Sequence, residues 1–242
     1  MATREIKHNN QHFSLNYEIL YHNRKEDIVI LHGWGSNKEV MKQAFGKHFT
    51  NFRHIYIDMP GFGKSPNEHS LTTEDYASIM IALLKELSVS SSIIFGHSFG
   101  GKVATLMNPE VLVLLSSAGI IIPKPFKVRA KIKLFKLLKP LGLTSLRHLF
   151  ASKDVQGMNQ GMYETFKNVV DEDFSAHFKA FKNKAYLFWG KDDSATPLFA
   201  GEQMASLIEN SHFYPLEGDH YFFLQQADFI ETTLLKELHG TH

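Results

Sequence analysis

Gly96-His97-Ser98-Phe99-Gly100 is the most informative stretch of this sequence. The apolar residues Ile93-Ile94-Phe95 precede it, and a helix-compatible run from Lys102 to Leu106 follows it. On a sharp turn between a strand and a helix, a serine hydroxyl stands clear of the backbone. Glycines two residues to either side remove the side chains that would collide there. The pattern therefore makes Ser98 a candidate nucleophile, with an ordinary serine in a helix-starting turn as the alternative.

Length and composition bound the class of protein. The 242 residues are enough for one large α/β domain whose core needs neither disulfides nor metals. Because the chain has no cysteine, a disulfide framework, a thiolate nucleophile and thiolate metal ligands are excluded, and a cytoplasmic location is expected. With 26 basic and 25 acidic residues the net charge is +1, so no global field favours nucleic acid. No signal-peptide-like stretch or membrane-spanning run is present, which predicts a soluble protein without integral membrane association.

Short apolar runs alternate with longer amphipathic runs along the chain. This alternation is typical of β-α units assembled into a mostly parallel sheet, so an α/β fold is expected. Thr72, followed by Thr73-Glu74-Asp75, resembles a capping box and predicts a helix start. Strands are expected at 13–20, 28–31, 55–57, 92–95, 111–115, 185–189 and 211–215, and helices at 38–49, 72–87, 99–107, 197–208 and 225–238.

One segment interrupts the alternation. Apolar residues recur at helical spacing between 126 and 138, and a second helix-like run covers 158–170. We therefore expect a core domain formed by residues 1–119 and 182–242, and a helical cap inserted at 120–181. From Lys124 to Lys153 the segment holds seven Lys and two Arg but no acidic residue. This basic run is either a solvated helix face or a docking surface for an acidic partner or an anionic membrane.

A serine nucleophile needs a base, and the base needs an orienting acid. The turn after the strand at 185–189 offers Asp192 and Asp193, and the loop after the strand at 211–215 ends in His220. His212 lies inside that expected strand, so His220 is the preferred base. The resulting chain order of serine, acid and histidine is that of α/β-hydrolases. The other histidines lack H-E-x-x-H or comparable ligand spacing, so neither a metal nor another cofactor is expected.

With these residues the chain resembles the α/β-hydrolase superfamily. Two more motifs carry the resemblance: His32-Gly33-Trp34-Gly35 after the first central strand, and Asp58-Met59-Pro60-Gly61-Phe62-Gly63-Lys64-Ser65 after the next. The resemblance implies an α/β-hydrolase fold, in which helices flank a mostly parallel central sheet and a helical cap is inserted. Asp58 is expected to organise its turn rather than to act in catalysis.

The resemblance also implies roles for individual residues. Ser98 would be the nucleophile and His220 the base. The family spacing, with the acid three residues after a glycine and four before a proline, selects Asp193 over Asp192. The backbone N–H groups of Trp34 and Phe99 would form the oxyanion hole. One departure is Gln225, which stands five residues after His220 where many relatives carry an acid.

A serine nucleophile argues against epoxide hydrolases and haloalkane dehalogenases, which resemble this chain but use aspartate. Meta-cleavage-product hydrolases commonly have Asn before the nucleophile, where this chain has His97. The stretch from His32 to Val40 looks more like the carboxylesterases that demethylate pimeloyl-acyl-carrier-protein methyl ester. Those enzymes recognise an acidic carrier protein through a basic cap, and the run from Lys124 to Lys136 offers such a surface.

We therefore expect a carboxylesterase-like serine hydrolase for small-molecule esters of small to medium acyl chain, with a carrier-linked ester as a further candidate substrate. Three alternatives stay open: a carbon-carbon bond hydrolase of 2-hydroxy-6-oxo-dienoate type, a lysophospholipase or lipase at a membrane surface, and a non-catalytic ligand-binding member of the fold. The sequence does not indicate an oligomeric state. Candidate substrate-lining residues, with simple packing as their alternative role, are Phe126, Phe135, Phe150, Met158, Met162 and Phe166.

Overall fold

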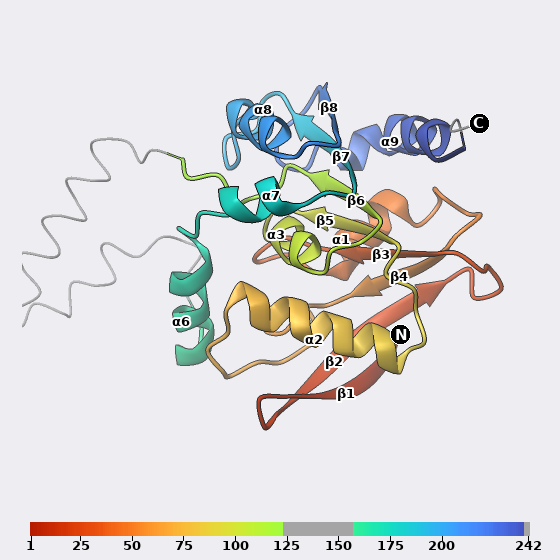
Figure 1. The fold of residues 1–242 in the computed structure, drawn as a ribbon. Coiled ribbons are helices and arrows are strands. Elements are labelled where there is room, and N and C mark those ends of the chain that lie inside the picture. The colour runs from red at the N-terminus through yellow and green to blue at the C-terminus, as the bar shows by residue number, and fades with distance from the viewer. Residues whose placement is uncertain (123–156, 240–242) are drawn as a thin grey trace, which may run out of the picture.

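The computed structural model describes residues 1–122 and 157–239, and in this part of the chain one eight-stranded sheet crosses the molecule (Figure 1). Its strand order is β1-β2-β4-β3-β5-β6-β7-β8. Strand β2 runs antiparallel to both of its neighbours, β1 and β4. The strands β3 to β8 are mutually parallel. The predicted mostly parallel α/β architecture is thus confirmed. The strands are β1 (Ala2–His8), β2 (Gln11–Leu20), β3 (Asp27–Leu31), β4 (Arg53–Ile57), β5 (Ile93–His97), β6 (Val111–Leu115), β7 (Lys184–Gly190) and β8 (Ser211–Leu216).

Helices cover both faces of the sheet. The central strands are buried on both sides, so their side chains alternate between two apolar layers: Val29 and Leu31 face one, and Ile28 and Ile30 face the other. Residues of α2 (Thr73–Glu86), α3 (Phe99–Leu106) and α8 (Leu198–Leu207) fill the first layer. Residues of α1 (Lys38–Phe45) and α9 (Phe223–His239) fill the second.

The starts of the helices follow the expected capping chemistry. The Thr72 side chain accepts a hydrogen bond from the Asp75 amide, and the Asp75 carboxylate accepts one from the Thr72 amide, so the predicted capping box of α2 is present. The expectation that the first helix reaches residue 49 is wrong. Helix α1 ends at Phe45 with Gly46 as its C-cap, and Phe49 has a φ of +50°, which no right-handed helix accommodates.

Among the described residues between β6 and β7, the structure contains the helices α6 (Gln160–Val169) and α7 (Ser175–Ala180). They belong to the segment expected to form the cap. Phe126, Phe135, Phe150 and the whole basic run from Lys124 to Lys153 lie outside the described residues. Within the ranges that the structure describes, no helix is both long enough and apolar enough to cross a bilayer.

The strand directions determine where the motif residues gather. His32, Asp58 and Ser98 follow the carboxyl ends of β3, β4 and β5, and Asp193 and His220 follow those of β7 and β8. Parallel strands present their carboxyl ends at one edge of the sheet, which is where open α/β sheets bind their ligands. The fold therefore collects all the sequence motifs at one edge.

Candidate active site

Ser98 occupies a strained turn between β5 and α3. Its φ of 50° and ψ of −117° lie in a region that residues with a side chain rarely adopt. A side chain at Gly96 would meet the backbone of Gly100, and one at Gly100 would meet the carbonyl oxygen of His32. Only glycine at both positions permits this close approach. The hydroxyl-bearing residue is partly exposed although its neighbours are buried, which is the geometry of a nucleophile elbow.

His220 and Asp193 form a close pair. His220 Nδ1 lies 2.7 Å from Asp193 Oδ2, and the Asp193 side chain is buried while that of His220 is about one-fifth exposed at 19%. Because the carboxylate can only accept, the imidazole carries its proton on Nδ1. In the neutral imidazole Nε2 is then the acceptor, as a general base requires. His212, the alternative histidine, lies exposed on β8 and stacks on Tyr186.

Asp193 is fixed by four hydrogen bonds. Oδ1 accepts from the amides of Ala195 (2.8 Å) and Thr196 (2.9 Å), and the Thr196 hydroxyl lies 2.8 Å from Oδ2, beside His220. Burial by itself would raise the pKa of the Asp193 carboxyl, but hydrogen bonds from His220 and Thr196 lower that pKa to about 2. The neighbouring Asp192 is exposed. Thr196 was not singled out from the sequence, although a threonine three residues after an aspartate is a spacing that favours this turn.

His97 connects the turn at Ser98 to the loop that carries His220. Its Nε2 donates to the His220 carbonyl oxygen at 3.0 Å, and the two imidazole rings have their centroids 4.6 Å apart. Since His97 immediately precedes Ser98, this contact places the His220 loop beside the elbow. In the sequence, His97 stands out only as a departure from the Asn that is common in meta-cleavage-product hydrolases. A polar residue at the end of a strand buried on both sides could have indicated this role.

The loop after β3 lies against Ser98. A side chain on Gly33 would come within 3.0 Å of Ser98 Cβ, and the Trp34 indole makes an edge contact with the Phe99 ring at 5.6 Å. Phe99 is the first residue of α3, so its N–H has no acceptor within the helix and is available to a ligand. The amides of Trp34 and Phe99 therefore belong to two segments that meet at Ser98.

His32 fixes the shape of that loop. Its Nδ1–H donates to the Gly33 carbonyl oxygen at 2.7 Å, and its Nε2 accepts from the Met59 amide at 3.1 Å. Burial is the largest cause that lowers the pKa of His32, to about 4. A neutral imidazole is required here, because a protonated Nε2 could not accept from Met59.

Asp58 acts as the organiser of its turn, in line with its sequence interpretation. Its buried carboxylate accepts from the backbone amide and the ammonium group of Lys38 at 2.8 and 2.7 Å, and from the Lys64 amide at 3.0 Å. Lys38 is the first residue of α1 and is itself buried. The carboxylate thus ties the glycine-rich turn after β4 to the start of α1.

Helix α6 lies beside the loop that carries Trp34. The Phe166 ring contacts the Trp34 indole at 5.4 Å, and Met162 packs against Gly61. A pocket of about 420 Å³ opens between this helix and the turn after β4. Ser98, Asp193 and His220 do not line it, so it adjoins the nucleophile site rather than containing it. Its lining includes Gly35, Phe62, Asn67, Met158, Asn159 and Met162.

Comparison with known protein families agrees with the α/β architecture that the structure shows. The model of the alpha/beta hydrolase family matches residues 28–232, which is most of the chain. The chain belongs to the alpha/beta hydrolase family. The family resemblance noted from the sequence is therefore confirmed, as is the expectation of a hydrolase-type enzyme.

Individual relatives of this alpha/beta hydrolase include esterases. It is 35% identical over 82 residues to pimeloyl-[acyl-carrier protein] methyl ester esterase of Vibrio cholerae, a match that covers 34% of this chain and 31% of that enzyme. Among solved structures, a hydrolase from Pseudomonas aeruginosa has a TM-score of 0.76 at 19% identity and covers 98% of both chains. A meta-cleavage product hydrolase from Pseudomonas fluorescens has a TM-score of 0.72 at 17% identity and covers 99% of this chain and 98% of that one. The matched region spans about a third of the Vibrio enzyme, and the two structural matches show the shared fold.

Proposed function

We propose that this protein hydrolyses carboxylic esters of small to medium acyl chain through Ser98, His220 and Asp193. The observation that carries the proposal is the 2.7 Å hydrogen bond between His220 Nδ1 and Asp193 Oδ2, beside a strained Ser98. The esterase among the relatives supports the choice of an ester bond.

The chemistry follows from the protonation states. His220 Nε2 removes the proton from the Ser98 hydroxyl as the oxygen attacks the acyl carbon, and Asp193 stabilises the resulting imidazolium. The carbonyl oxygen becomes an oxyanion that accepts from the amides of Trp34 and Phe99, at about 3 to 4 kcal/mol per donor. His220 then returns the proton to the leaving alcohol. A water molecule, deprotonated by the same imidazole, releases the acid from Ser98.

The test is turnover of p-nitrophenyl esters from acetate to octanoate. Ser98→Ala is expected to lower kcat by about 10⁴-fold or more, because the remaining groups cannot replace the nucleophile. Ser206→Ala is the matched control: Ser206 lies exposed on α8, where its hydroxyl donates to Gln203, and its loss leaves turnover unchanged. A fluorophosphonate probe should label the parent protein and not Ser98→Ala. Turnover that survives in Ser98→Ala would refute the proposal, and an unlabelled, inactive parent would favour the ligand-binding alternative.

A carrier-linked acyl ester is the natural substrate that we propose within this class. The support is the named activity of the Vibrio relative together with the acid-free basic run from Lys124 to Lys136. An acidic carrier protein would be attracted by such a charge, which raises the association rate more than the strength of individual contacts.

Charge reversal separates docking from chemistry. Lys127→Glu combined with Lys131→Glu is expected to lower kcat/KM for an acyl-carrier ester by about tenfold at low salt and to leave p-nitrophenyl esters unaffected. Lys25→Glu, which reverses the charge of an exposed lysine in the segment before β3, is the matched control. An equal loss on both substrates would argue against docking through the basic run.

A further inference from the structure

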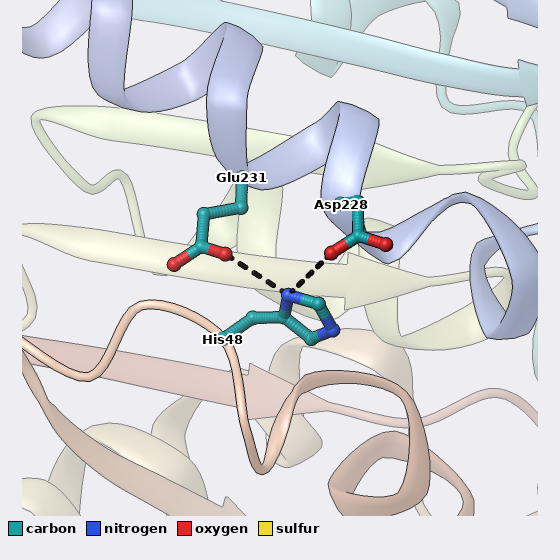
Figure 2. Close-up of side chains that lie close together, drawn as sticks. All are labelled: His48, Asp228 and Glu231. Atoms are coloured by element: carbon teal, nitrogen blue, oxygen red, sulfur yellow. Dashed lines mark hydrogen bonds and ion pairs between the residues drawn. The ribbon is translucent and has the colours of Figure 1, made fainter.

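His48, Asp228 and Glu231 direct their side chains toward one point. Asp228 and Glu231 project from α9, and His48 reaches them from the turn between α1 and β4 (Figure 2). His48 Nδ1 lies 2.9 Å from Glu231 Oε2 and 3.6 Å from Asp228 Oδ1, and the donor atoms all lie within 4.8 Å of one another. One imidazole nitrogen and two carboxylate oxygens thus face the same small volume.

The spacing of these donors suits a small divalent cation. Zinc binds histidine nitrogen and carboxylate oxygen at about 2.0 to 2.2 Å, so neighbouring ligand atoms in a tetrahedral site stand about 3.4 Å apart. The two distances from His48 Nδ1 lie on either side of this value. Asp228 has a 95% exposed side chain and is free to rotate inward. Its exposure also leaves room for water to complete the coordination sphere.

No lysine or arginine among the described residues forms an ion pair with Asp228 or Glu231. The ion pairs of both carboxylates are with the His48 imidazole. The second oxygen of Glu231, Oε1, accepts from the Phe49 amide. A carboxylate that is held in this way through one oxygen presents the other in a fixed direction, as supporting hydrogen bonds do for metal ligands.

We propose that His48, Asp228 and Glu231 bind a divalent transition-metal cation of the zinc class. The mixed nitrogen and oxygen donors favour Zn²⁺ over Mg²⁺, because imidazole is a ligand for the former and all-oxygen sites suit the latter. When the metal binds Nδ1, the proton that Nδ1 of the neutral imidazole shares with Glu231 moves to Nε2, so the other tautomer forms and the ring stays neutral.

The position of the site predicts what the metal does. The turn that carries His48 precedes β4, so it lies at the amino edge of the sheet, whereas the nucleophile, base and acid follow the carboxyl ends. The bound cation joins α9 to the turn after α1, and its ligands His48 and Asp228 stand 180 positions apart in the chain. Metal therefore stabilises the folded protein and leaves ester hydrolysis unchanged.

The test uses full-length protein stripped with a chelator and then titrated with ZnCl₂ or MgCl₂. We expect one equivalent of Zn²⁺ to bind by calorimetry and to raise the melting temperature, with no effect of Mg²⁺ at the same concentration. Asp228→Asn should weaken Zn²⁺ binding by at least about tenfold while leaving the metal-free melting temperature unchanged, because the side chain is exposed. His48→Gln should weaken binding as well. Glu202→Gln, an exposed carboxylate on α8, is the matched control and should bind as the parent does.

The outcomes decide between a metal site and a simple hydrogen bond. If no equivalent of Zn²⁺ binds, the three side chains only tie α9 to the turn through the His48–Glu231 hydrogen bond, and the proposal is wrong. If Zn²⁺ binds equally to Asp228→Asn, His48→Gln and the parent, the metal resides on other histidines, and the proposal is again wrong. Selective loss in the two ligand variants supports it.

Discussion

Two buried histidines hold the active-site loops as neutral hydrogen-bonding groups. His32 accepts from the Met59 amide, and His97 donates to the His220 carbonyl oxygen. Burial is the main cause that lowers the pKa of His97 to about 3, with the charge of His220 adding to it, and burial lowers the pKa of His32 to about 4. An imidazole that stays neutral at these positions keeps one nitrogen as a fixed acceptor and the other as a fixed donor.

Protonation of these two histidines should make folding strongly pH-dependent. Between about pH 4 and 6.5 the unfolded chain binds a proton on each imidazole and the folded chain does not, so acid favours unfolding. These two protons should therefore make the free energy of unfolding rise with pH in this window by about 2.7 kcal/mol per unit, from about 1.36 kcal/mol per proton. Urea unfolding at pH 4.5, 5.0 and 5.5 measures the slope.

His97→Gln is the variant that isolates one of the two protons. Glutamine can still donate to the His220 carbonyl oxygen but does not titrate, so the slope should fall by about 1.4 kcal/mol per pH unit. His212→Gln, at an exposed position on β8, is the control and should leave the slope unchanged. An unaltered slope in His97→Gln would mean that His97 titrates alike in both states.

Thr196 is expected to be a positioning residue for Asp193. Its hydroxyl lies 2.8 Å from the carboxylate oxygen that also binds His220, and 3.0 Å from the Ser116 carbonyl oxygen. Thr196→Val keeps the shape of the side chain and removes these bonds, so kcat on a p-nitrophenyl ester should fall by about tenfold with KM little changed. Thr196→Ser retains the hydroxyl and should restore kcat. Equal activity of both variants would assign the hydroxyl a packing role.

At the scale of elements, apolar runs predicted the central strands well because both of their faces are buried. The stretches Ile28–Leu31 and Val111–Leu115 contain only aliphatic residues, and the structure contains β3 and β6 there. Strand β1 was missed because it is an edge strand in which only Ile6 is buried, so its sequence lacks an apolar period. The end of α1 was also misplaced, since nothing in the sequence around Phe49 reveals its left-handed backbone.

The candidate site divides along similar lines. Ser98, Asp193 and His220 stand in loops directly after strands, where a short motif and the chain order identify them. The residues that support them, such as His97 and Thr196, act through contacts with segments distant in the sequence, and a single chain gives little signal for those. The cluster of His48, Asp228 and Glu231 also joins distant segments, and the sequence did not reveal it because its spacing matches no short metal motif.

A buried ion pair connects α3 to the segment between α6 and α7. Lys102 Nζ, on α3, lies 2.7 Å from Glu172 Oε2 and 2.7 Å from the Val169 carbonyl oxygen, and the Thr73 hydroxyl donates to the same carboxylate at 2.6 Å. Burial lowers the pKa of Lys102, although Glu172 opposes this by favouring the charged form. The pair therefore carries a desolvation cost that only an intact partner offsets.

Removal of one partner should cost more than removal of both. Glu172→Gln leaves the Lys102 ammonium buried without its counter-charge and should lower the free energy of unfolding by about 2 kcal/mol, a value reduced for the partial exposure of Glu172. Adding Lys102→Met should recover part of that loss. Urea unfolding of the two single variants and the double variant measures the coupling. Strictly additive losses would show that the two charges do not depend on each other.

At the scale of the whole molecule, α6 is attached to the sheet through the loop that follows β4. The side-chain amide of Asn159 donates to the Asn67 backbone carbonyl oxygen at 2.7 Å, and the Thr165 hydroxyl accepts from the Leu71 backbone amide at 2.9 Å. Gly61 has a φ of +87°, which residues with a side chain rarely adopt, and its open side is filled by the end of the Met162 side chain. These contacts fix the helix over the β4 loop and bring Phe166 to the Trp34 indole.

Phe166 is therefore expected to limit the length of the acyl chain. Its ring contacts Trp34, whose amide is proposed to bind the oxyanion, so an acyl group extending from Ser98 meets this aromatic wall. Phe166→Ala opens space beside the loop that carries Trp34 and should raise the ratio of kcat/KM for p-nitrophenyl octanoate over butyrate by about tenfold, the low end of the effect of binding one more methylene in an apolar pocket, which is about 10- to 200-fold. Phe199→Ala, which removes an exposed phenylalanine from α8, should leave the ratio unchanged. A ratio that stays constant in Phe166→Ala would mean that the acyl chain leaves the nucleophile in another direction, away from α6.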